Sequence, residues 1–356
     1  MGSPSYTPVS SLGAHSVAWF SARIIAGSFR DTAMTRLLTP LLLTVAFLFS
    51  VAGLHVSANA ASPSHTAQPV TAEASASVVA VLTGDDGVSV SLPVAAQRIV
   101  SLLPSLAEVL CDLGACDRLV GVDRYTNWPA SLQKLPRMGG GLDPNLEMIL
   151  SVRPDLVVMA PSSRAIPRLR ALGLNVLALE PKRYAELRRT YAVLGQAVGR
   201  SDGEQLYTGL HDRLLALRAR IPSVWMGARL YVEVSSELYA AAPSSFVGQT
   251  LTALGLGNAI SDEFGPFPKV NPEWVVRLQP DVLVVSQASA QSLNRRPGWP
   301  QLAALKQGRV CVMSEAQADR LVRPGPRLYE GAQWLLTCLK ALSPPQQTTR
   351  RATPAS

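Results

Sequence analysis

Histidine is nearly absent from this chain of 356 residues, which contains four. His15, His55 and His65 precede the part that we expect to fold, so only His211 remains there. A zinc or manganese site built on histidine is therefore not expected. A Ser-His-Asp or Cys-His hydrolase would have to use His211, which lacks a suitable partner nearby. These absences argue against an enzyme, and we expect neither a metal nor a cofactor.

Nucleotide-binding and nucleic-acid-binding signatures are missing as well. There is no G-x-x-x-x-G-K-S/T loop, and no G-x-G-x-x-G follows a predicted strand. The glycine-rich stretch at 139–141 has no lysine and does not open a helix directly. The net charge is +8, but the arginines are scattered and form no basic stripe with interleaved aromatic residues. We expect no nucleic-acid partner, and we interpret the charge as a surface property that helps to attract an anionic ligand.

The N-terminal part reads as a targeting segment. Met34 and Arg36 precede an apolar run at 37–54, which ends before the small residues Ala58 and Ala60. This pattern predicts a signal peptide that is cleaved after Ala60, with the true start at Met34. The alternative is a retained membrane anchor, for which the run is at the lower limit of length.

The expected signal peptide (1–60) is followed by segments of low complexity. Residues 61–78 consist mainly of Ala, Ser, Thr and Pro and predict a disordered linker, and the polar residues 344–356 predict a disordered tail. A lipoprotein signal would need a cysteine just after the apolar run, where this chain has none. We therefore expect an exported, periplasmic protein.

Between these ends, predicted strands and helices alternate. The hydrophobic content of 47% and the charged content of 16% fit a globular protein. The alternation predicts an α/β fold with mainly parallel sheets. At 181–222 the alternation stops, and apolar residues at helical spacing predict helices without a strand. We therefore expect two Rossmann-like lobes, 79–180 and 223–343, which are joined through one long backbone helix.

A pattern of fifteen residues occurs once in each expected lobe. Residues 145–159 read NLEMILSVRPDLVVM and residues 271–285 read NPEWVVRLQPDVLVV, with Asn, Glu, Pro and Asp at the same offsets. Each copy predicts a short amphipathic helix, a Pro-Asp turn and a buried strand. Glu147 and Glu273 would then occupy equivalent places on two similar lobes, as docking onto a two-fold symmetric partner requires. The alternative is that a common α/β unit recurs by chance.

The loops that follow predicted strands hold the candidate ligand-binding residues. Ligands of open α/β sheets bind beyond the carboxyl ends of the strands. Aromatic rings from both lobes with a few polar groups would suit a large, flat, partly apolar molecule. The candidates are Ser105, Tyr125, Asn127 and Trp128 in the first lobe and Tyr239, Phe267, Asp319, Arg320 and Arg323 in the second.

All four cysteines lie in the part that we expect to be exported, where disulfides can form. Cys111 and Cys116 are close enough in the sequence to be bridged across a helix end. Cys311 on a late strand could pair with Cys338 on the last helix. The alternative is four buried thiols. The distances between the cysteines in the folded protein decide between these possibilities, and the sequence does not show them.

Three stretches together resemble the periplasmic binding proteins of the helical-backbone class. They are 98–108 (RIVSLLPSLAE), 119–129 (LVGVDRYTNWP) and the first repeat copy with its Asn-Leu-Glu and Pro-Asp-Leu. That class serves ABC importers for cobalamin, ferric siderophores and haem. The resemblance covers residues 79–343, and within the class the chain looks most like cobalamin-binding proteins.

The resemblance implies a monomeric receptor that is not an enzyme. It would bind cobalamin or a related corrinoid between its lobes and deliver it to a permease dimer with ATPase subunits. Glu147 and Glu273 match the glutamates that dock onto arginines of the two permease subunits. Tyr125, Tyr239 and Phe267 fall where cobalamin binders place aromatic residues, although the family often has Trp at the last position.

Other ligands and another function stay open. Residues 139–142 depart from the pattern of cobalamin binders, in which another aromatic residue could lie there, and Asp319 and Arg320 match polar residues of the family only loosely. Arg124, Arg320 and Arg323 could instead meet an anionic ferric siderophore, and Tyr125 or Tyr239 could be an axial ligand of haem. A different class of function is an exported two-lobe α/β enzyme, against which the missing histidine and nucleophile motif argue.

Overall fold

The computed structural model describes residues 80–344. The expected signal peptide, the linker and the tail beyond residue 344 lie outside this range. Within it, no helix combines the length and the apolar composition needed to span a membrane. We call residues 80–180 the N-terminal lobe and residues 223–343 the C-terminal lobe.

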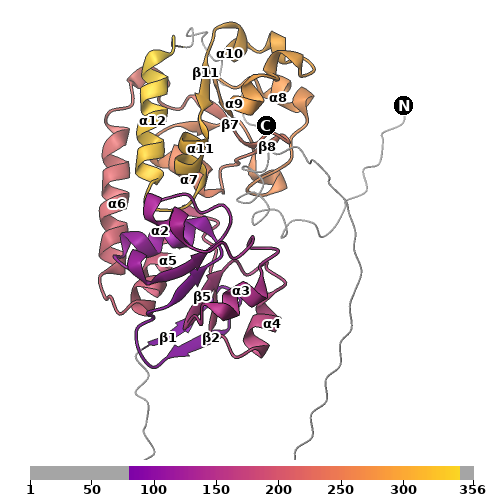
Figure 1. The fold of residues 1–356 in the computed structure, drawn as a ribbon. Helices are drawn as coiled ribbons and strands as arrows, with labels where there is room; N and C mark the ends of the chain where they lie inside the picture. Colours follow the sequence, from indigo (N-terminus) through magenta and orange to yellow (C-terminus); the bar gives the residue numbers. More distant parts are fainter. Residues whose placement is uncertain (1–79, 345–356) are drawn as a thin grey trace, which may run out of the picture. The chain divides into compact units, whose positions relative to one another are not determined.

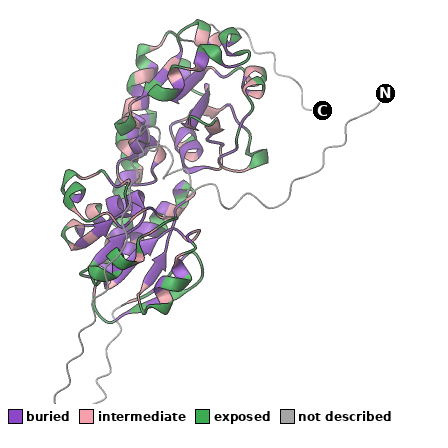
Figure 2. Cartoon of the chain, turned by 45° about the vertical axis from the view of Figure 1, so that its right-hand side comes forward, coloured by how far each residue is buried: buried purple, intermediate pink, exposed green. Residues whose placement is uncertain are grey.

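A parallel sheet with the strand order β4-β3-β5-β6 forms the centre of the N-terminal lobe (Figure 1). Its strands are short apolar runs that are buried almost throughout, as parallel strands covered on both faces require (Figure 2). They are β3 (Ile99–Ser101), β4 (Leu119–Val122), β5 (Leu156–Met159) and β6 (Val176–Ala178). The helices of this lobe are α2 (Pro104–Asp112), α3 (Leu146–Ser151) and α4 (Ile166–Ala171).

A β-hairpin precedes this sheet, as the Asp-Gly turn in the sequence predicts. Strands β1 (Ala80–Thr83) and β2 (Ser89–Leu92) pair antiparallel, and Gly87 adopts a φ of +76° in the turn. The Asp85 amide donates to the Ala178 carbonyl at 2.7 Å, and the Asp85 carboxylate accepts from the Glu180 amide at 2.7 Å. These bonds attach the hairpin to the end of β6.

The sheet of the C-terminal lobe repeats the same strand order. Strands β9-β7-β10-β11 run parallel and correspond one by one to β4-β3-β5-β6, while β8 pairs antiparallel with β7. The strands are β7 (Arg229–Ser235), β8 (Tyr239–Ala240), β9 (Gly257–Asn258), β10 (Val282–Ser286) and β11 (Val310–Met313). The helices are α7 (Phe246–Ala253), α8 (Pro272–Leu278), α9 (Gln287–Ala290), α10 (Ala303–Lys306), α11 (Glu315–Val322) and α12 (Leu328–Ala341). The expected fold class, two α/β lobes with mainly parallel sheets, is confirmed.

Two helices, α5 (Tyr184–Ala197) and α6 (Gly203–Arg218), form the connection between the lobes. They pack very closely, because a Cβ atom at Gly203 would lie 2.3 Å from the Tyr191 carbonyl oxygen. Helix α6 also packs against α12 of the C-terminal lobe (Figure 1). With 16 residues it measures about 24 Å, so the single long helix of the expectation is α6, with α5 packed beside it.

The two repeat copies begin and end their helices in the same way. Asn145 is the N-cap of α3 and accepts from the Met148 amide, and Asn271 is the N-cap of α8 and accepts from the Glu273 amide. One residue before each Pro-Asp pair the chain turns through a positive φ, 44° at Arg153 and 45° at Gln279. The repeat is therefore a structural unit with shared capping.

The shared aspartates also have structural partners. Asp155 accepts from the amides of Gln97 at 2.7 Å and Arg98 at 3.0 Å, just before β3. Asp281 accepts from the Arg229 amide at 2.7 Å, at the start of β7. Each aspartate thus ties the turn to the neighbouring strand of its lobe.

Residues 315–322, which we expected to be part of a loop, form helix α11 instead. The Ser314 hydroxyl accepts from the Gln317 amide at 3.4 Å, and the Gln317 side chain accepts from the Ser314 amide at 2.8 Å. This reciprocal capping box has the sequence signature Ser-x-x-Gln, which the reading of the sequence overlooked. The helix matters for the site, because it turns Asp319 and Arg320 to different faces, and Arg323 follows it directly as the C-cap.

Candidate functional site

The loop at 123–129, which we call the ligand loop, follows β4 and is organised by Asp123. One oxygen of this buried carboxylate accepts from the Tyr125 amide at 2.6 Å, the Thr126 amide at 2.7 Å and the Thr126 hydroxyl at 3.1 Å. Burial raises the pKa of Asp123 to about 6, against the lowering effect of these hydrogen bonds and of Arg323. Arg137 donates to the Thr126 carbonyl at 2.7 Å from the other side. The loop is therefore held in one conformation.

Two aromatic rings lie on this loop, and both are half-buried. The guanidinium of Arg124 lies 5.9 Å from the centre of the Tyr125 ring and forms an ion pair with Asp143 at 2.5 Å. Trp128 precedes Pro129 through a cis peptide bond. Their partial exposure leaves ring surface available to an apolar ligand.

Three of the candidates come together from the two lobes, although they are far apart in the sequence. The Asn127 side chain donates to Asp319 at 2.7 Å and accepts from Arg323 at 2.9 Å. Asp319 of α11 and Arg323, the residue directly after this helix, pair with each other at 2.7 Å. A single amide of the N-terminal lobe therefore bonds to both members of an ion pair of the C-terminal lobe.

Two further members of this cluster, Glu108 and Arg327, were missed in the sequence. Glu108 is 1% exposed and Arg327 is 5% exposed. Arg327 donates through Nε to one carboxylate oxygen at 2.9 Å and through Nη2 to the other, and Arg323 approaches at 3.2 Å. Burial raises the pKa of the Glu108 carboxyl, and the two guanidinium groups oppose that shift. We call Glu108, Asn127, Asp319, Arg323 and Arg327 the inter-lobe cluster.

Two signals in the sequence could have revealed these residues. Glu108 lies between the apolar residues Ala107 and Val109 of α2, and both of these are buried. A carboxylate among apolar residues needs a cationic partner when it is buried. Residues 323–327 read RPGPR, with an arginine on each side of a sharp turn. Neither signal names the partner, because the two segments are more than 200 residues apart.

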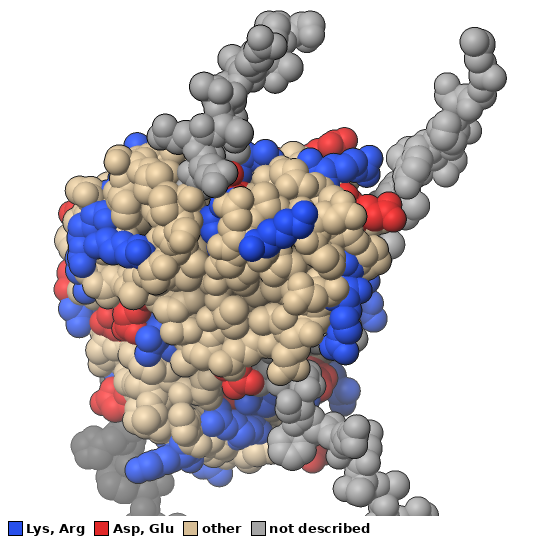
Figure 3. Space-filling view, turned by 90° about the horizontal axis from the view of Figure 1, so that it is seen from above, with Lys and Arg blue, Asp and Glu red and all other residues tan. Residues whose placement is uncertain are grey.

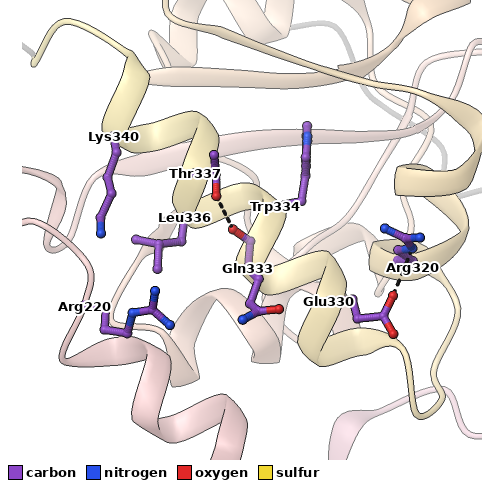
Figure 4. Close-up of a pocket in the computed structure, with 8 residues that line it drawn as sticks. All are labelled: Arg220, Arg320, Glu330, Gln333, Trp334, Leu336, Thr337 and Lys340. Atoms are coloured by element: carbon purple, nitrogen blue, oxygen red, sulfur yellow. Dashed lines mark hydrogen bonds and ion pairs between the residues drawn. The ribbon is translucent and has the colours of Figure 1, made fainter.

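Ser105 and Arg320 are not members of the cluster, but only Arg320 lies in different surroundings. The Ser105 carbonyl oxygen borders the cluster, because a Cβ atom at Gly325, between Arg323 and Arg327, would lie 3.8 Å from it. Ser105 is buried in the first turn of α2. Arg320 lies on another face of α11, with Nε 3.1 Å from Glu330 of α12. It lines a cavity of about 490 Å³, in which Arg220 and Lys340 lie at the opposite end (Figure 4). Arg320 and Arg323, which are both candidates for the site, therefore lie in different surroundings.

The two aromatic candidates of the C-terminal lobe differ in burial. Phe267 is 8% exposed and packs against Phe246, with 6.0 Å between ring centres, so it belongs to the core. Tyr239 is half-buried on β8, and the Lys269 ammonium lies 5.8 Å from its ring centre. Of the two, Tyr239 presents more surface to solvent.

Glu147 and Glu273 are both exposed in the first turns of α3 and α8. The residue after each glutamate is apolar. Met148 is 37% exposed, and Trp274 packs against Phe264, which is 61% exposed, with 5.5 Å between ring centres. In the repeat, Asn and Asp bond to the backbone, whereas the two glutamates point outward. Glu147 and Glu273 are therefore exposed negative charges at equivalent positions of the two lobes, where a partner protein could contact both.

The cysteines form two disulfides, Cys111–Cys116 and Cys311–Cys338.

In residues 80–344 no group of three or more His, Cys, Asp or Glu side chains could hold a metal ion. His211 lies on α6, with Nδ1 3.0 Å from the Tyr184 hydroxyl. On the face seen in Figure 3, Lys and Arg lie in separate small groups with uncharged surface between them.

Comparisons with known proteins agree with this architecture. A family model described as periplasmic binding protein matches residues 99–316. The chain is 28% identical to the uncharacterized ABC transporter substrate-binding lipoprotein YvrC of Bacillus subtilis, over 67% of this chain and 78% of that protein.

Two solved structures are similar in fold. The periplasmic vitamin B12 binding protein BtuF of Vibrio cholerae has a TM-score of 0.59 and 27% identity, over 69% of this chain and 97% of that chain. The periplasmic haem-binding protein RhuT of Roseiflexus has a TM-score of 0.61 and 24% identity, over 69% of this chain and 99% of that chain.

Proposed function

Since the chain belongs to the periplasmic binding protein family, we propose that it is the extracytoplasmic receptor of an ABC importer and that its ligand is cobalamin or a related corrinoid. The family match agrees with the resemblance drawn from the sequence and with a protein that is not an enzyme. The class includes relatives for vitamin B12, haem and iron complexes. The observation that carries the choice of ligand is the 27% identity with the vitamin B12 binding protein over 97% of that chain.

The pairing of the three arginines that the sequence offers for an anionic complex also favours a corrinoid over a ferric siderophore. The arginines that could meet an anionic complex are each paired with a carboxylate: Arg124 with Asp143, Arg320 with Glu330, and Arg323 with Asp319. The opposite charges of such a pair partly cancel, so the pair attracts an anion less than a lone guanidinium would. A large ring rimmed by amides would instead gain from the half-buried Tyr125 and Trp128 rings and from hydrogen bonds to a rigid loop.

Haem is less well supported as a ligand. An axial ligand would have to come from Tyr125 or Tyr239, because His211 lies on α6 in contact with Tyr184. The likeness to the haem-binding RhuT has 24% identity and supports the shared fold alone. The visible absorption spectrum of the loaded protein distinguishes a corrinoid from haem directly.

The test is a calorimetric titration of the purified chain with cyanocobalamin and, in parallel, with hemin and a ferric siderophore. We expect saturable binding of cyanocobalamin, with a Kd on the order of micromolar or lower. Tyr125→Ala should weaken it about tenfold, as the loss of one aromatic contact predicts. Phe264→Ala is the matched control, because this exposed ring lies beside Trp274 and not on the ligand loop. Saturable binding of an iron complex without cyanocobalamin binding would move the assignment to iron uptake.

A further inference from the structure

We propose that Arg323 and Arg327 of the C-terminal lobe are positioning residues for the ligand loop of the N-terminal lobe. In this view, the contact between the lobes sets the conformation of the loop before any ligand arrives. The inference rests on the proposed function only where it concerns ligand affinity. The conformational part stands on the geometry of the inter-lobe cluster.

Arg323 reaches three groups of the N-terminal lobe with one guanidinium. Nη1 donates to the Asn127 side chain at 2.9 Å and lies 3.2 Å from the Glu108 carboxylate. Nη2 donates to the main-chain carbonyl of Tyr125 at 3.4 Å. The arginine therefore contacts both the backbone and a side chain of the ligand loop, on either side of Thr126.

Arg327 holds the other end of the loop. Its guanidinium carbon lies 5.1 Å from the centre of the Trp128 ring, while its nitrogens bond to Glu108. A planar guanidinium can stack on a ring and donate to a carboxylate at the same time, which a lysine ammonium cannot do. The orientation of Trp128 is thus linked to a residue of the opposite lobe.

Burial makes this arrangement hard to change. Glu108, Asp319, Arg323 and Arg327 are each at most 5% exposed, and their two negative and two positive charges balance. If the lobes shifted, buried charges would lose their partners without gaining full solvation, which is costly. The structure therefore favours a single position of Arg323 and Arg327 relative to the ligand loop.

The two arginines are held by a rigid turn. Arg323 follows α11 directly and Arg327 precedes α12 directly. The two helices pack closely, because a Cβ atom at Gly331 of α12 would lie 2.8 Å from the Arg320 carbonyl oxygen. A Cβ atom at Gly325, in the middle of the turn, would lie 3.6 Å from the Glu108 carboxylate. The turn thus fits against α2 and presents both arginines from fixed positions.

The ligand loop is accordingly fixed from two sides. Asp123 organises it from within the N-terminal lobe, and the arginines hold its outer end from the C-terminal lobe. Such preorganisation spares the ligand the entropic cost of ordering the loop. We infer that removal of the arginines loosens the loop and weakens ligand binding, even though both residues belong to the other lobe.

Hydrogen exchange of the unliganded protein tests the conformational part. Arg323→Met should accelerate exchange in the segment 124–129 about tenfold relative to the core strand β5, as the loss of a charged hydrogen bond predicts. This segment is a suitable reporter because the Tyr125 and Thr126 amides donate to Asp123. The matched control is Arg320→Met, which removes an arginine from the same helix and should leave the segment unchanged.

A second variant keeps the test decisive if Arg323→Met does not fold. Asp319→Asn/Arg323→Met removes one charge of each sign and leaves Glu108 paired with Arg327, so it avoids a buried unpaired charge. Unchanged exchange in 124–129 of this folded variant would overturn the proposal. A purely local role of Arg323 in the C-terminal lobe predicts that outcome.

Ligand titration of the same variants tests the link to function. The Kd for cyanocobalamin should rise about tenfold in Arg323→Met and in the double variant, but not in Arg320→Met. If the unmodified chain binds cyanocobalamin while accelerated exchange leaves the Kd unchanged, the functional half of the inference is wrong. If the unmodified chain does not bind it at all, the proposed ligand fails, and the exchange result still decides whether the arginines position the loop.

Discussion

Substitution of Asp123 by Asn should change how the stability of the protein depends on pH. The carboxylate is buried, and a single oxygen accepts the three hydrogen bonds that shape the ligand loop. An asparagine keeps an oxygen for those donors but cannot ionise. The variant therefore removes the charge while retaining the acceptor.

The magnitude follows from the pKa of the group. Burial raises the pKa of Asp123 from 3.8 to about 6, so the folded state binds the proton more tightly than the unfolded state. Stability from this group is fully present below its unfolded pKa and is lost as pH rises through about 6. The shift corresponds to about 3 kcal/mol, of which about 2.5 kcal/mol should be lost between about pH 4 and about pH 7.5.

Urea unfolding at several pH values measures the effect. The free energy of unfolding of Asp123→Asn minus that of the unmodified protein should increase by about 2.5 kcal/mol from about pH 4 to about pH 7.5. Other carboxyls with a raised pKa, such as Glu108, are present in both proteins and cancel in this difference. Asp143→Asn, which alters an exposed acid, is the control and should show no such increase. A difference that stays constant with pH would refute the reasoning.

Two further predictions concern the disulfides and the docking surface. The Cys311–Cys338 disulfide closes a loop of 27 residues, and replacing both of its cysteines should lower the free energy of unfolding by about 3.5 kcal/mol. The Cys111–Cys116 disulfide closes a loop of 5 residues, and the same replacement there should lower it by about 2 kcal/mol. Chemical denaturation of the two double variants compares these losses. Charge reversal of Glu147 and Glu273 to Arg should abolish ligand uptake by cells while leaving ligand binding by the purified protein unchanged.

Controls make both comparisons decisive. Equal losses from the two disulfides would show that loop length does not govern their contribution. For the docking surface, reversal of the exposed acids Asp117 and Glu315 introduces the same change in net charge at other places on the two lobes. Uptake that fails equally in this control, or ligand binding that is lost with Glu147 and Glu273, would contradict the docking role.

The repeat shows which features a sequence pattern can predict reliably. The N-caps Asn145 and Asn271 and the Pro-Asp turns act on backbone groups within a few residues, or at the start of the adjacent strand. The spacing of these residues is therefore enough to predict the helix, the turn and the strand, and both copies fold as expected. The same locality explains the correct hairpin at the start of the N-terminal lobe, where an Asp-Gly turn joins two short strands.

The error at α11 has a different origin. Polar side chains after a strand predict a loop, whereas the capping box of Ser314 and Gln317 begins a helix there. The helix turns Asp319 and Arg320 to different faces, so these two candidates have different partners. The pattern was present in the sequence, so this part of the site was predictable.

The sequence by itself determined the class of fold, the duplicated lobes and the place of the loop 123–129 after β4, because periodicity, caps and turns are local properties of the chain. Only the tertiary structure decided which charges meet. Glu108 bonds to Arg323 and Arg327 across 215 and 219 residues, and no local pattern encodes such a distance. An ion pair depends on separation in space and on burial, and both arise only when the two lobes have packed against each other.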